Sequence, residues 1–580
     1  MMTVSRSPQH PPSITVAREL ILALHSCGVR DVVYCPGSRS APFAYVLSAV
    51  EAAGHMRVHI RLDERNAAFV AVGLSRAGLL ASGRARPVAV VTTSGGAVAE
   101  LHAGVAEASH SRLPLIIVSA DRPFEMRDVG ASQTTTQVGI FASHIRHTWD
   151  IPAGIDADHR CGRVAARAVA VARGLPAGVP GPVHLNVGLR DPLVPHPGLS
   201  LDVEQSTAGA MVAVSRGEVA EVPWEEALDP TLRTVIVAGD GADRRSAEWA
   251  EAAHVPLLAE PTSGVTLSSA WVAHQQSLLN IPELTQQIEQ VLVTGRPTLS
   301  RVVSALLARD DVRIVVQSGD SEWVDVAGRA SLVIPALRAA TAHHEDATWL
   351  DQWRSRGAKV SAAVDMITCK CDDADAPTLL SVADALWNVR DTALLIGASN
   401  AIRAVDLIAR GEGRSDCISN RGLAGIDGTI STAFGLAWGS DRPLRVMLGD
   451  LTFFHDASAL ACAPEEELPH VQCVVVDDGG GAIFASLEHG RAEYQDMYER
   501  WFATRQDVSI EALAQAYGVS YERVDTVGQL REVLTKPVRG RSIVHVPVQR
   551  NPDLLSEVAH FYTQKTFSKD SESIELEGSY

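Results

Sequence analysis

Residues 449–484 read GDLTFFHDASALACAPEEELPHVQCVVVDDGGGAIF, and this stretch decides the fold. Asp450 follows one mostly apolar run, Asp477-Asp478 follows a second, and each run reads as a buried strand. The spacer between them has room for one helix and one strand, so a crossover brings the two strand ends together. Carboxylates hold a hard cation such as Mg²⁺, and the cation with nearby glycine amides holds phosphate oxygens. The stretch therefore predicts an α/β fold with a metal and diphosphate site at one sheet edge.

A second motif lies in the first third of the chain, where residues 59–73 read HIRLDERNAAFVAVG. A short β-like run ends at Asp63-Glu64, and a helix of small residues follows. Ligands in open α/β sheets bind at the carboxyl ends of the strands, which is where Glu64 is expected. An Asp-Glu pair of this kind more often lies at the solvent-exposed N-terminus of a helix, without a ligand. The order along the chain favours function, because the glutamate precedes the metal motif as it does in thiamine-diphosphate decarboxylases.

The two motifs together resemble those of thiamine-diphosphate enzymes, in which the metal motif begins GDG and ends NN. Here Leu451 replaces the third glycine, and Asp477-Asp478 replace the paired asparagines. In that class a glutamate hydrogen-bonds the pyrimidine ring of the cofactor, and the resemblance implies this role for Glu64. On its own the metal motif is only suggestive, because many α/β proteins have a strand, an acidic turn and a helix without a ligand.

Composition is that of a large enzyme. The 580 residues suggest several domains, and 46% of them are hydrophobic. No run approaches the ~20 apolar residues that a membrane span needs. The start lacks the apolar core of a signal peptide, so we expect a cytoplasmic protein with eight reduced cysteines. A net charge of −18 argues against nucleic acid as a partner.

The chain divides into three blocks, which predict three α/β domains with mainly parallel sheets. The first block (1–195) and the third block (377–565) alternate apolar strands with alanine-rich helices, as βαβ units do. The central block (205–365) carries no strong motif, and a polar tail (566–580) closes the chain. We expect strands at 32–35, 88–92, 115–119, 183–187, 234–238, 314–317, 393–396, 445–448, 473–476 and 542–546.

Polar motifs with arginine, serine or glutamine follow several of these strands. They are PGSRSAP at 36–42, SADRP at 119–123, GASQ at 130–133, GASNAIR at 397–403 and SNRGLAGIDG at 419–428. The planar fork of arginine binds both oxygens of a carboxylate. A single arginine is more often part of a surface ion pair. A set of them at the ligand ends of sheets instead indicates substrates with several carboxylates.

In the same order, these motifs resemble one family, 2-succinyl-5-enolpyruvyl-6-hydroxy-3-cyclohexene-1-carboxylate synthase (MenD). The resemblance covers about 1–195 and 377–550, and in the central block only GRPTLSR at 295–301. The family decarboxylates 2-oxoglutarate on thiamine diphosphate and adds the succinyl-semialdehyde carbanion to isochorismate, in menaquinone biosynthesis. It implies a thiamine-diphosphate-binding fold with a pyrimidine-binding domain (1–195), a central domain (205–365) and a diphosphate-binding domain (377–565).

The resemblance also implies roles for individual residues. Catalytic roles fall to Glu64, Arg39 and Gln133. Cofactor contacts fall to Glu64, Ile426, Gly449, Asp450, Leu451 and Ile483. Substrate contacts fall to Ser38, Arg39, Arg122, Gln133, Arg301, Ser399, Arg403, Arg421, Phe484 and Leu487. Asp450, Asp478 and the carbonyl of Gly480 would bind the metal, Mg²⁺ or Mn²⁺.

The chain departs from the family in two places and leaves two alternatives open. Leu423-Ala424 stand where Ala-Ser is common, and Glu100 stands where a neutral amide is common. One alternative is another carboligase, such as an acetolactate synthase with FAD in the central domain. The other is a non-catalytic relative that kept the fold. In this cofactor class the site lies between subunits, so we expect a homodimer or homotetramer.

Overall fold

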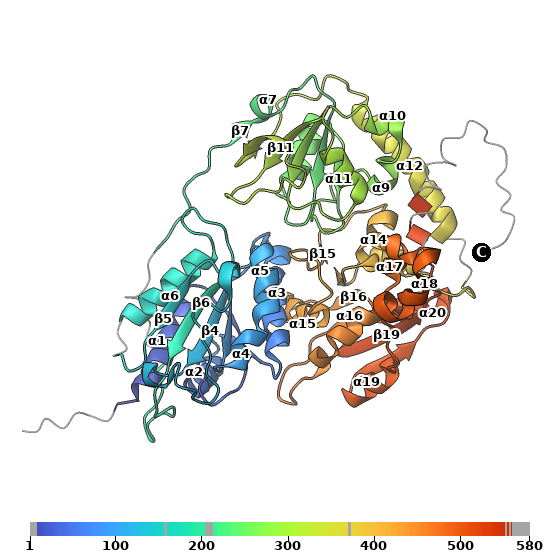
Figure 1. Cartoon of the computed structure of the whole chain (residues 1–580). Coiled ribbons are helices and arrows are strands. Elements are labelled where there is room, and N and C mark those ends of the chain that lie inside the picture. Colours follow the sequence, from blue (N-terminus) through green and yellow to red (C-terminus); the bar gives the residue numbers. More distant parts are fainter. Residues whose placement is uncertain are drawn as a thin grey trace, which may run out of the picture.

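The computed structural model describes residues 9–155, 159–203, 213–368, 373–551, 554–555 and 558–559. Three large sheets with helices packed on them make up this part of the chain (Figure 1). One sheet lies within each of the three blocks predicted from the sequence. The predicted polar tail, 566–580, lies outside the described residues. No helix in the described ranges is long and apolar enough to cross a membrane, and the cytoplasmic location stays a prediction.

The first sheet has the order β2-β1-β3-β4-β6-β5, and all its strand pairs are parallel. Its interior strands are buried along their length, which explains their continuous Val and Ile runs. The strands are β1 (Asp31–Tyr34), β2 (Arg57–Ile60), β3 (Val88–Thr92), β4 (Leu115–Asp121), β5 (Thr148–Ile151) and β6 (Val183–Gly188). The helices are α1 (Pro12–Ser26), α2 (Ala41–Ala52), α3 (Glu64–Ser82), α4 (Gly96–Glu100), α5 (His102–His110) and α6 (His159–Ala172).

The central sheet has the order β12-β11-β10-β8-β9 and is also parallel. Its strands are β8 (Thr234–Ala238), β9 (Leu257–Ala259), β10 (Gln290–Thr294), β11 (Arg313–Gln317) and β12 (Ala330–Ile334). A short pair, β7 (Val222–Pro223) and β13 (Leu337–Arg338), lies beside it. Its main helices are α8 (Ser246–Ala253), α10 (Pro282–Thr285), α11 (Arg301–Leu307) and α12 (Trp349–Thr368).

The third sheet has the order β15-β14-β16-β17-β19-β18, the same pattern of crossovers as the first sheet. Its strands are β14 (Ala393–Ile396), β15 (Cys417–Ile418), β16 (Leu444–Gly449), β17 (Val471–Asp477), β18 (Ser520–Arg523) and β19 (Arg541–Pro547). Helices around it include α13 (Leu379–Asn388), α14 (Asn400–Ile408), α15 (Thr429–Ser440), α16 (Asp450–His455), α17 (Ala482–Ala485), α18 (Gln495–Tyr498), α19 (Ile510–Ala516) and α20 (Val527–Thr535). Because the strand order reverses beside β1 in one sheet and β14 in the other, each sheet offers a ligand crevice there.

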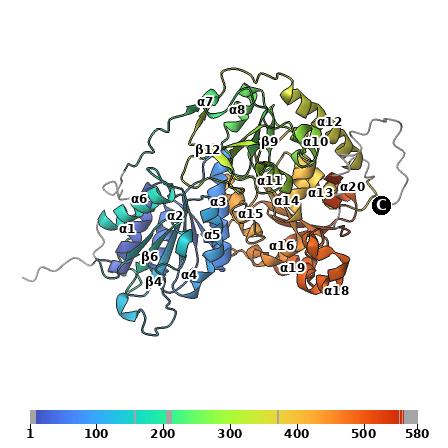
Figure 2. The ribbon, with the colours of Figure 1, turned by 45° about the horizontal axis from the view of Figure 1, so that its top comes forward.

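Helices α3 and α15 lie side by side between the first and third sheets in both views (Figures 1 and 2). Glycines permit this close approach. A Cβ at Gly73 would overlap the carbonyl oxygen of Thr432, and a Cβ at Gly435 would overlap the carbonyl oxygen of Val70. Residues of both helices share one hydrophobic core. The two sheets are thus joined through a backbone-to-backbone helix contact.

Replacing Gly73 by Ala should therefore destabilise the protein by about 1–3 kcal/mol, because backbone cannot yield as a side chain does. Chemical denaturation measures this change. Gly357→Ala in α12 is the matched control, since its Cβ would make ordinary contacts and Ala favours a helix by about 0.5–1 kcal/mol. Equal stability of the two variants would contradict the close contact.

Candidate active site

Almost all of the predicted site residues follow the carboxyl ends of strands, and they form two groups. The first-block group surrounds the ends of β1, β2 and β4, and consists of Ser38, Arg39, Glu64, Arg122 and Gln133. The third-block group surrounds β14, β15, β16 and β17. It consists of Ser399, Arg403, Arg421, Ile426, Gly449, Asp450, Leu451, Asp478, Gly480, Ile483, Phe484 and Leu487. Arg301 joins the third-block group from the central block.

Arg39 and Arg122 form a pair of like charges in the first-block group. Arg39 is buried, and its Nη1 donates to the carbonyl of Leu189 at 2.9 Å and lies 3.4 Å from Asp191. Arg122 donates to the carbonyl of Ser132 at 3.0 Å. Burial and the neighbouring Arg39 lower the pKa of Arg122. Two guanidinium groups this close are stabilised by an anion that binds between them.

Glu64 is the first residue of α3, and the residue before it caps the helix. The Asp63 carboxylate accepts from the backbone N–H of Asn66 at 3.1 Å, so Glu64 is not needed as the N-cap. Glu64 is half-buried, and burial raises the pKa of its carboxyl, with smaller contributions from Asp63 and Glu100. A carboxyl that keeps its proton more readily can act as a hydrogen-bond donor. The unusual Glu100 therefore acts on Glu64 and strengthens this property.

The metal motif brings Asp450 and Asp478 together from two neighbouring strands. Burial raises the pKa of Asp450 to about 6, with a contribution from Asp477. Burial and the Asp450 carboxylate raise the pKa of Asp478 to about 7. Both shifts reflect the cost of holding negative charges together in a partly desolvated place, and a divalent cation relieves that cost. The donor set therefore fits the metal that the sequence predicts.

The same loop leaves room for phosphate oxygens beside these carboxylates. Gly480 has φ 126°, its N–H donates to Asp450, and its carbonyl accepts from Ala482 at 2.9 Å. At Gly449 a Cβ would meet no atom closer than 4.0 Å, so the backbone at the strand end is open. In the described ranges no group of three His, Cys, Asp or Glu side chains could hold a metal. Two carboxylates and one carbonyl would supply half of a Mg²⁺ coordination sphere, and phosphate and water oxygens complete such spheres.

Three arginines from two blocks meet in the third-block group. Burial lowers the pKa of Arg403, and the charges of Arg421 and Arg301 lower it further. Arg421 is buried, donates to the Thr298 hydroxyl at 3.1 Å, and has an Nε without a partner. Arg403 donates to the carbonyl of Ser399 at 2.7 Å. Such a cluster of positive charges suits a substrate with more than one carboxylate.

Backbone strain occurs at one predicted residue in each group. Ser399 has φ 72° and ψ −138°, and Gln133 has φ 55°. Residues other than glycine rarely adopt such values, and where they do the site is often functional. At Gln133 the carbonyl accepts from the Ser94 hydroxyl at 2.9 Å, which holds the strained turn. Both strained residues come at the ligand end of a sheet.

Five members of the third-block group are apolar. Ile426 lies three residues before α15 and is half-buried, as are Leu451, Ile483 and Leu487. Phe484 is partly exposed and contacts Phe502, with ring centroids 6.0 Å apart. These residues supply the apolar side chains of the group.

Sequence reasoning missed the groups that support the metal motif. His545 Nε2 lies 2.9 Å from the Asp477 carboxylate, and the Tyr521 hydroxyl lies 2.9 Å from His545 Nδ1. Arg550 donates to the carbonyls of Asp478, at 3.1 Å, and Gly479. None of these residues carries a local motif. Only the position of His545 in a strand beside β17 could have suggested its role.

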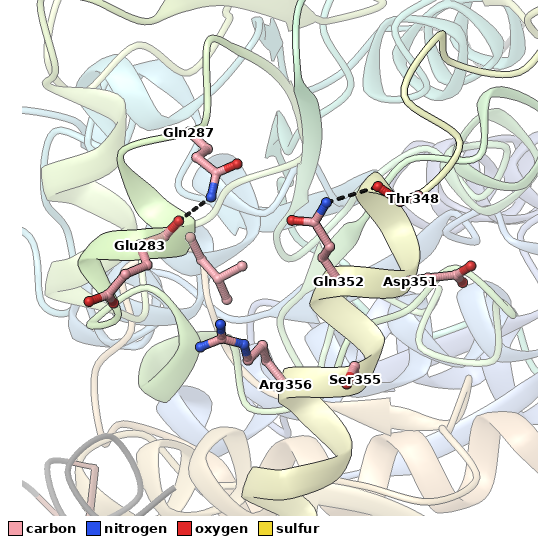
Figure 3. Close-up of a pocket in the computed structure, with 8 residues that line it drawn as sticks. Glu283, Gln287, Thr348, Asp351, Gln352, Ser355 and Arg356 are labelled. Carbon is pink, nitrogen blue, oxygen red and sulfur yellow. Dashed lines mark hydrogen bonds between the residues drawn. The ribbon is translucent and has the colours of Figure 1, made fainter. Parts of the chain in front are cut away.

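A pocket of about 380 Å³ in the central block lies away from both groups (Figure 3). It lies between α10 and α12, where the Arg356 guanidinium points across from α12 toward α10. Gln352 donates to the Thr348 hydroxyl at 2.9 Å, and Gln287 donates to the carbonyl of Glu283. The pocket contains no predicted site residue.

The described part of the chain does not join the two groups by polar contacts. Among the described residues, no hydrogen bond or ion pair joins a member of the first-block group to a member of the third-block group. The first and third blocks are linked through other residues, chiefly by the contact of α3 with α15 and by hydrogen bonds of Asp63 and Asn66 with Ser458 and Asp456. Each group thus offers a partial set of functional side chains.

Two protein-family models match the chain. The first is described as the N-terminal TPP binding domain of thiamine pyrophosphate enzymes and matches residues 14–140. The second is described as the C-terminal TPP binding domain of the same enzymes and matches residues 400–548. The matches cover the two blocks that hold the predicted site groups, and they confirm that the chain is a thiamine-diphosphate enzyme.

Curated relatives match nearly the whole chain. It is 42% identical over 559 residues to a 2-succinyl-5-enolpyruvyl-6-hydroxy-3-cyclohexene-1-carboxylate synthase of Paenarthrobacter aurescens, covering 93% of this chain and 94% of the relative. It is 42% identical over 552 residues to the synthase of that name from Kineococcus radiotolerans, covering 93% and 96%. Among solved structures, benzoylformate decarboxylase from Polynucleobacter necessarius superposes with a TM-score of 0.64 at 17% identity, covering 92% of this chain and 99% of that chain. That likeness shows the fold alone and confirms the predicted α/β class.

The metal motif gives a first prediction for the site. Asp450→Ala should abolish binding of thiamine diphosphate at millimolar Mg²⁺, because a cation held by these carboxylates would be needed to bind the diphosphate. Asp478→Asn should still bind, because the amide oxygen can replace one carboxylate oxygen as a ligand. Isothermal titration calorimetry measures both. Asp525→Ala, an exposed acid of the same block, is the control. Normal cofactor binding by Asp450→Ala would show that the metal site lies elsewhere.

Proposed function

The chain belongs to the 2-succinyl-5-enolpyruvyl-6-hydroxy-3-cyclohexene-1-carboxylate synthase family of thiamine-diphosphate enzymes, and we propose that its two site groups together form the active site. The enzyme decarboxylates 2-oxoglutarate and adds the resulting four-carbon unit to isochorismate, a step of menaquinone biosynthesis. The observation that carries the assignment of the site is the clustering of arginines at the ligand ends of both outer sheets. Two substrates with four carboxylates between them require such a set.

The third-block group would hold the cofactor. Asp450, Asp478 and the carbonyl of Gly480 would bind Mg²⁺ or Mn²⁺ and through it the diphosphate, beside the backbone of Gly449 and Leu451. Ile426 and Ile483 would pack against the rings. When bound, thiamine diphosphate supplies the electron sink for the electron pair released as 2-oxoglutarate loses CO₂.

Glu64 would act on the pyrimidine ring from the first-block group. Its raised pKa, caused mainly by burial, favours the protonated carboxyl that can donate a hydrogen bond to a ring nitrogen. Glu64 is the first residue of α3, so its side chain lies near the C-terminal ends of the strands of the first sheet. Arg39 and Gln133 lie beside the same edge, where they can orient a substrate.

The arginines would divide between the two substrates. Arg403, with Ser399, Arg301 and Arg421, belongs to the group that would hold the cofactor, so it would act on the substrate that reacts first. Arg39 and Arg122, with Ser38, lie in the other group and would bind isochorismate. Phe484 and Leu487 would form the apolar wall beside it.

We propose that a homodimer is the smallest active unit, with each site built from the first-block group of one chain and the third-block group of its partner. The lack of a hydrogen bond or ion pair between the groups within the described part of one chain supports this arrangement. So do large apolar side chains exposed beside both groups. Leu62 is 87% exposed, Phe124 85% and Trp501 62%, and the proposed dimer would bury side chains of this kind.

An assay with 2-oxoglutarate, isochorismate, thiamine diphosphate and Mg²⁺ tests the function directly. Isochorismate absorbance should disappear only when all four are present. An acetolactate synthase would be the better assignment if the enzyme consumed pyruvate as fast as 2-oxoglutarate while the isochorismate absorbance did not change. An absorbance scan for bound flavin separates the same two alternatives.

Glu64→Gln should lower turnover by on the order of 10² or more, the usual scale for losing general acid–base assistance. The amide keeps the shape of the side chain but cannot gain or lose the proton. Cofactor affinity, measured by calorimetry, should change far less. Near-normal turnover would remove Glu64 from the mechanism.

Single arginine variants should separate the two half-reactions. Arg39→Ala and Arg122→Ala should still release CO₂ from 2-oxoglutarate in a single turnover. Product formation should be slower, with an activation free energy higher by about 2–5 kcal/mol. Arg403→Ala should damage both steps. Arg190→Ala, an exposed arginine paired with Glu125, is the control. The division between substrates is wrong if Arg39→Ala and Arg122→Ala lose CO₂ release as completely as Glu64→Gln.

A further inference from the structure

Glu107 reaches from the first block onto a loop of the third block. It lies on α5, is 3% exposed, and its carboxylate faces the loop formed by residues 419–428. One carboxylate oxygen accepts from the backbone N–H of Gly422 at 2.9 Å. The other accepts from the N–H of Leu423 at 2.7 Å. A single buried side chain thus binds two successive amides of another block.

Two further donors hold the Glu107 carboxylate from its own block. The Ser111 hydroxyl donates at 2.7 Å, and Arg76 Nη2 lies at 3.3 Å. Arg76, on α3, is as buried as Glu107 and also lies 3.8 Å from Asp240 of the central block. Four donors satisfy both oxygens, as a buried charge requires. The carboxylate is therefore held in place before it binds the loop.

The peptide at Gly422 is also held from its other side. Arg296, from the central block, donates to the carbonyl of Gly422 at 2.9 Å and to the carbonyl of His110. There is no space for a side chain, because a Cβ at Gly422 would lie 2.6 Å from the Glu107 carbonyl oxygen and from Ser111 Oγ. Three blocks therefore meet at one peptide group. We call Glu107, Arg76 and Arg296 the Gly422 clamp.

The clamp lies next to residues with proposed roles. Arg421 directly precedes Gly422, is 5% exposed, and faces Arg403. Ala424, two residues later, has φ 57°, so the loop turns sharply before Ile426. Since the clamp fixes the peptide after Arg421, it also fixes the Cα from which the Arg421 side chain extends to its hydrogen bond with Thr298.

We propose that Glu107 is a positioning residue, which aligns Arg421 with a substrate carboxylate by clamping the amides of Gly422 and Leu423. The proposal rests on the substrate role proposed for Arg421. A carboxylate is needed because it accepts from both amides and from Arg76 at once. A glutamine would turn its NH₂ group toward one of these donors and lose that contact.

The test compares Glu107→Gln with Arg421→Ala in steady-state kinetics. Both variants should raise the KM of the same substrate, Glu107→Gln by about tenfold, while the KM of the other substrate changes less. Gly422→Ala, whose Cβ would push the loop away from Glu107 and Ser111, should show the same pattern. Arg57→Gln is the control. It removes a contact between the same two blocks, from Arg57 to the Trp438 carbonyl at 3.0 Å, far from this loop. Its KM values should stay within about twofold.

Hydrogen exchange supplies a readout that needs no activity. In Glu107→Gln the amides of Gly422 and Leu423 should exchange at least about tenfold faster, with protection in β17 unchanged. A KM pattern unlike that of Arg421→Ala, or unchanged exchange at these two amides, would overturn the proposal. If the parent enzyme does not consume isochorismate, the proposed function fails and the exchange measurement alone decides whether Glu107 clamps the loop.

Discussion

The contact between α3 and α15 is the constraint on which the rest of the structure depends. Glycines at 73 and 435 let the two backbones touch, so the first and third sheets have one fixed relation. Helix α3 begins at Glu64, and α15 begins three residues after Ile426. A contact made for packing therefore sets the positions of residues in both site groups. The Gly422 clamp adds hydrogen bonds between the same two blocks, and one of its members, Arg76, lies on α3.

The site is built at a cost in electrostatic and backbone energy. Like charges are placed together in three places: Arg39 beside Arg122, the arginines around Arg403, and the carboxylates around Asp450. Burial and this proximity lower the pKa of Arg122 and of Arg403 and raise the pKa of Asp450 and of Asp478. Ser399 and Gln133 hold backbone angles that L-residues seldom adopt. Such costs are concentrated at functional sites because ligands of opposite charge, or the reaction itself, make use of them.

The sequence predicted the fold well where strands are buried on both faces. Strands 88–92, 234–238 and 393–396 have the bounds expected, because continuous apolar runs end at glycines, prolines or polar turns. It missed edge strands such as β5 and β18, whose exposed polar residues carry little periodicity. It also missed β10, although that strand is buried along its length. Motifs beside strand ends placed Glu64, Arg122, Asp450 and Asp478 at ligand edges. Contacts between blocks could not be predicted from such motifs. Glu107 and Gly422 are 315 positions apart, and no local sequence pattern indicates that the two residues meet.

Mixing two inactive variants tests most directly whether the site is completed by a second chain. Glu64→Gln disables the first-block group, and Asp450→Ala disables the third-block group. If each site combines groups from two chains, a mixed dimer has one intact site and one doubly defective site. With random exchange half of the dimers are mixed, so an equimolar mixture should recover about a quarter of the parent activity. If each site is built within one chain, every site carries a defect, and activity that stays at the level of the separate variants would contradict the account.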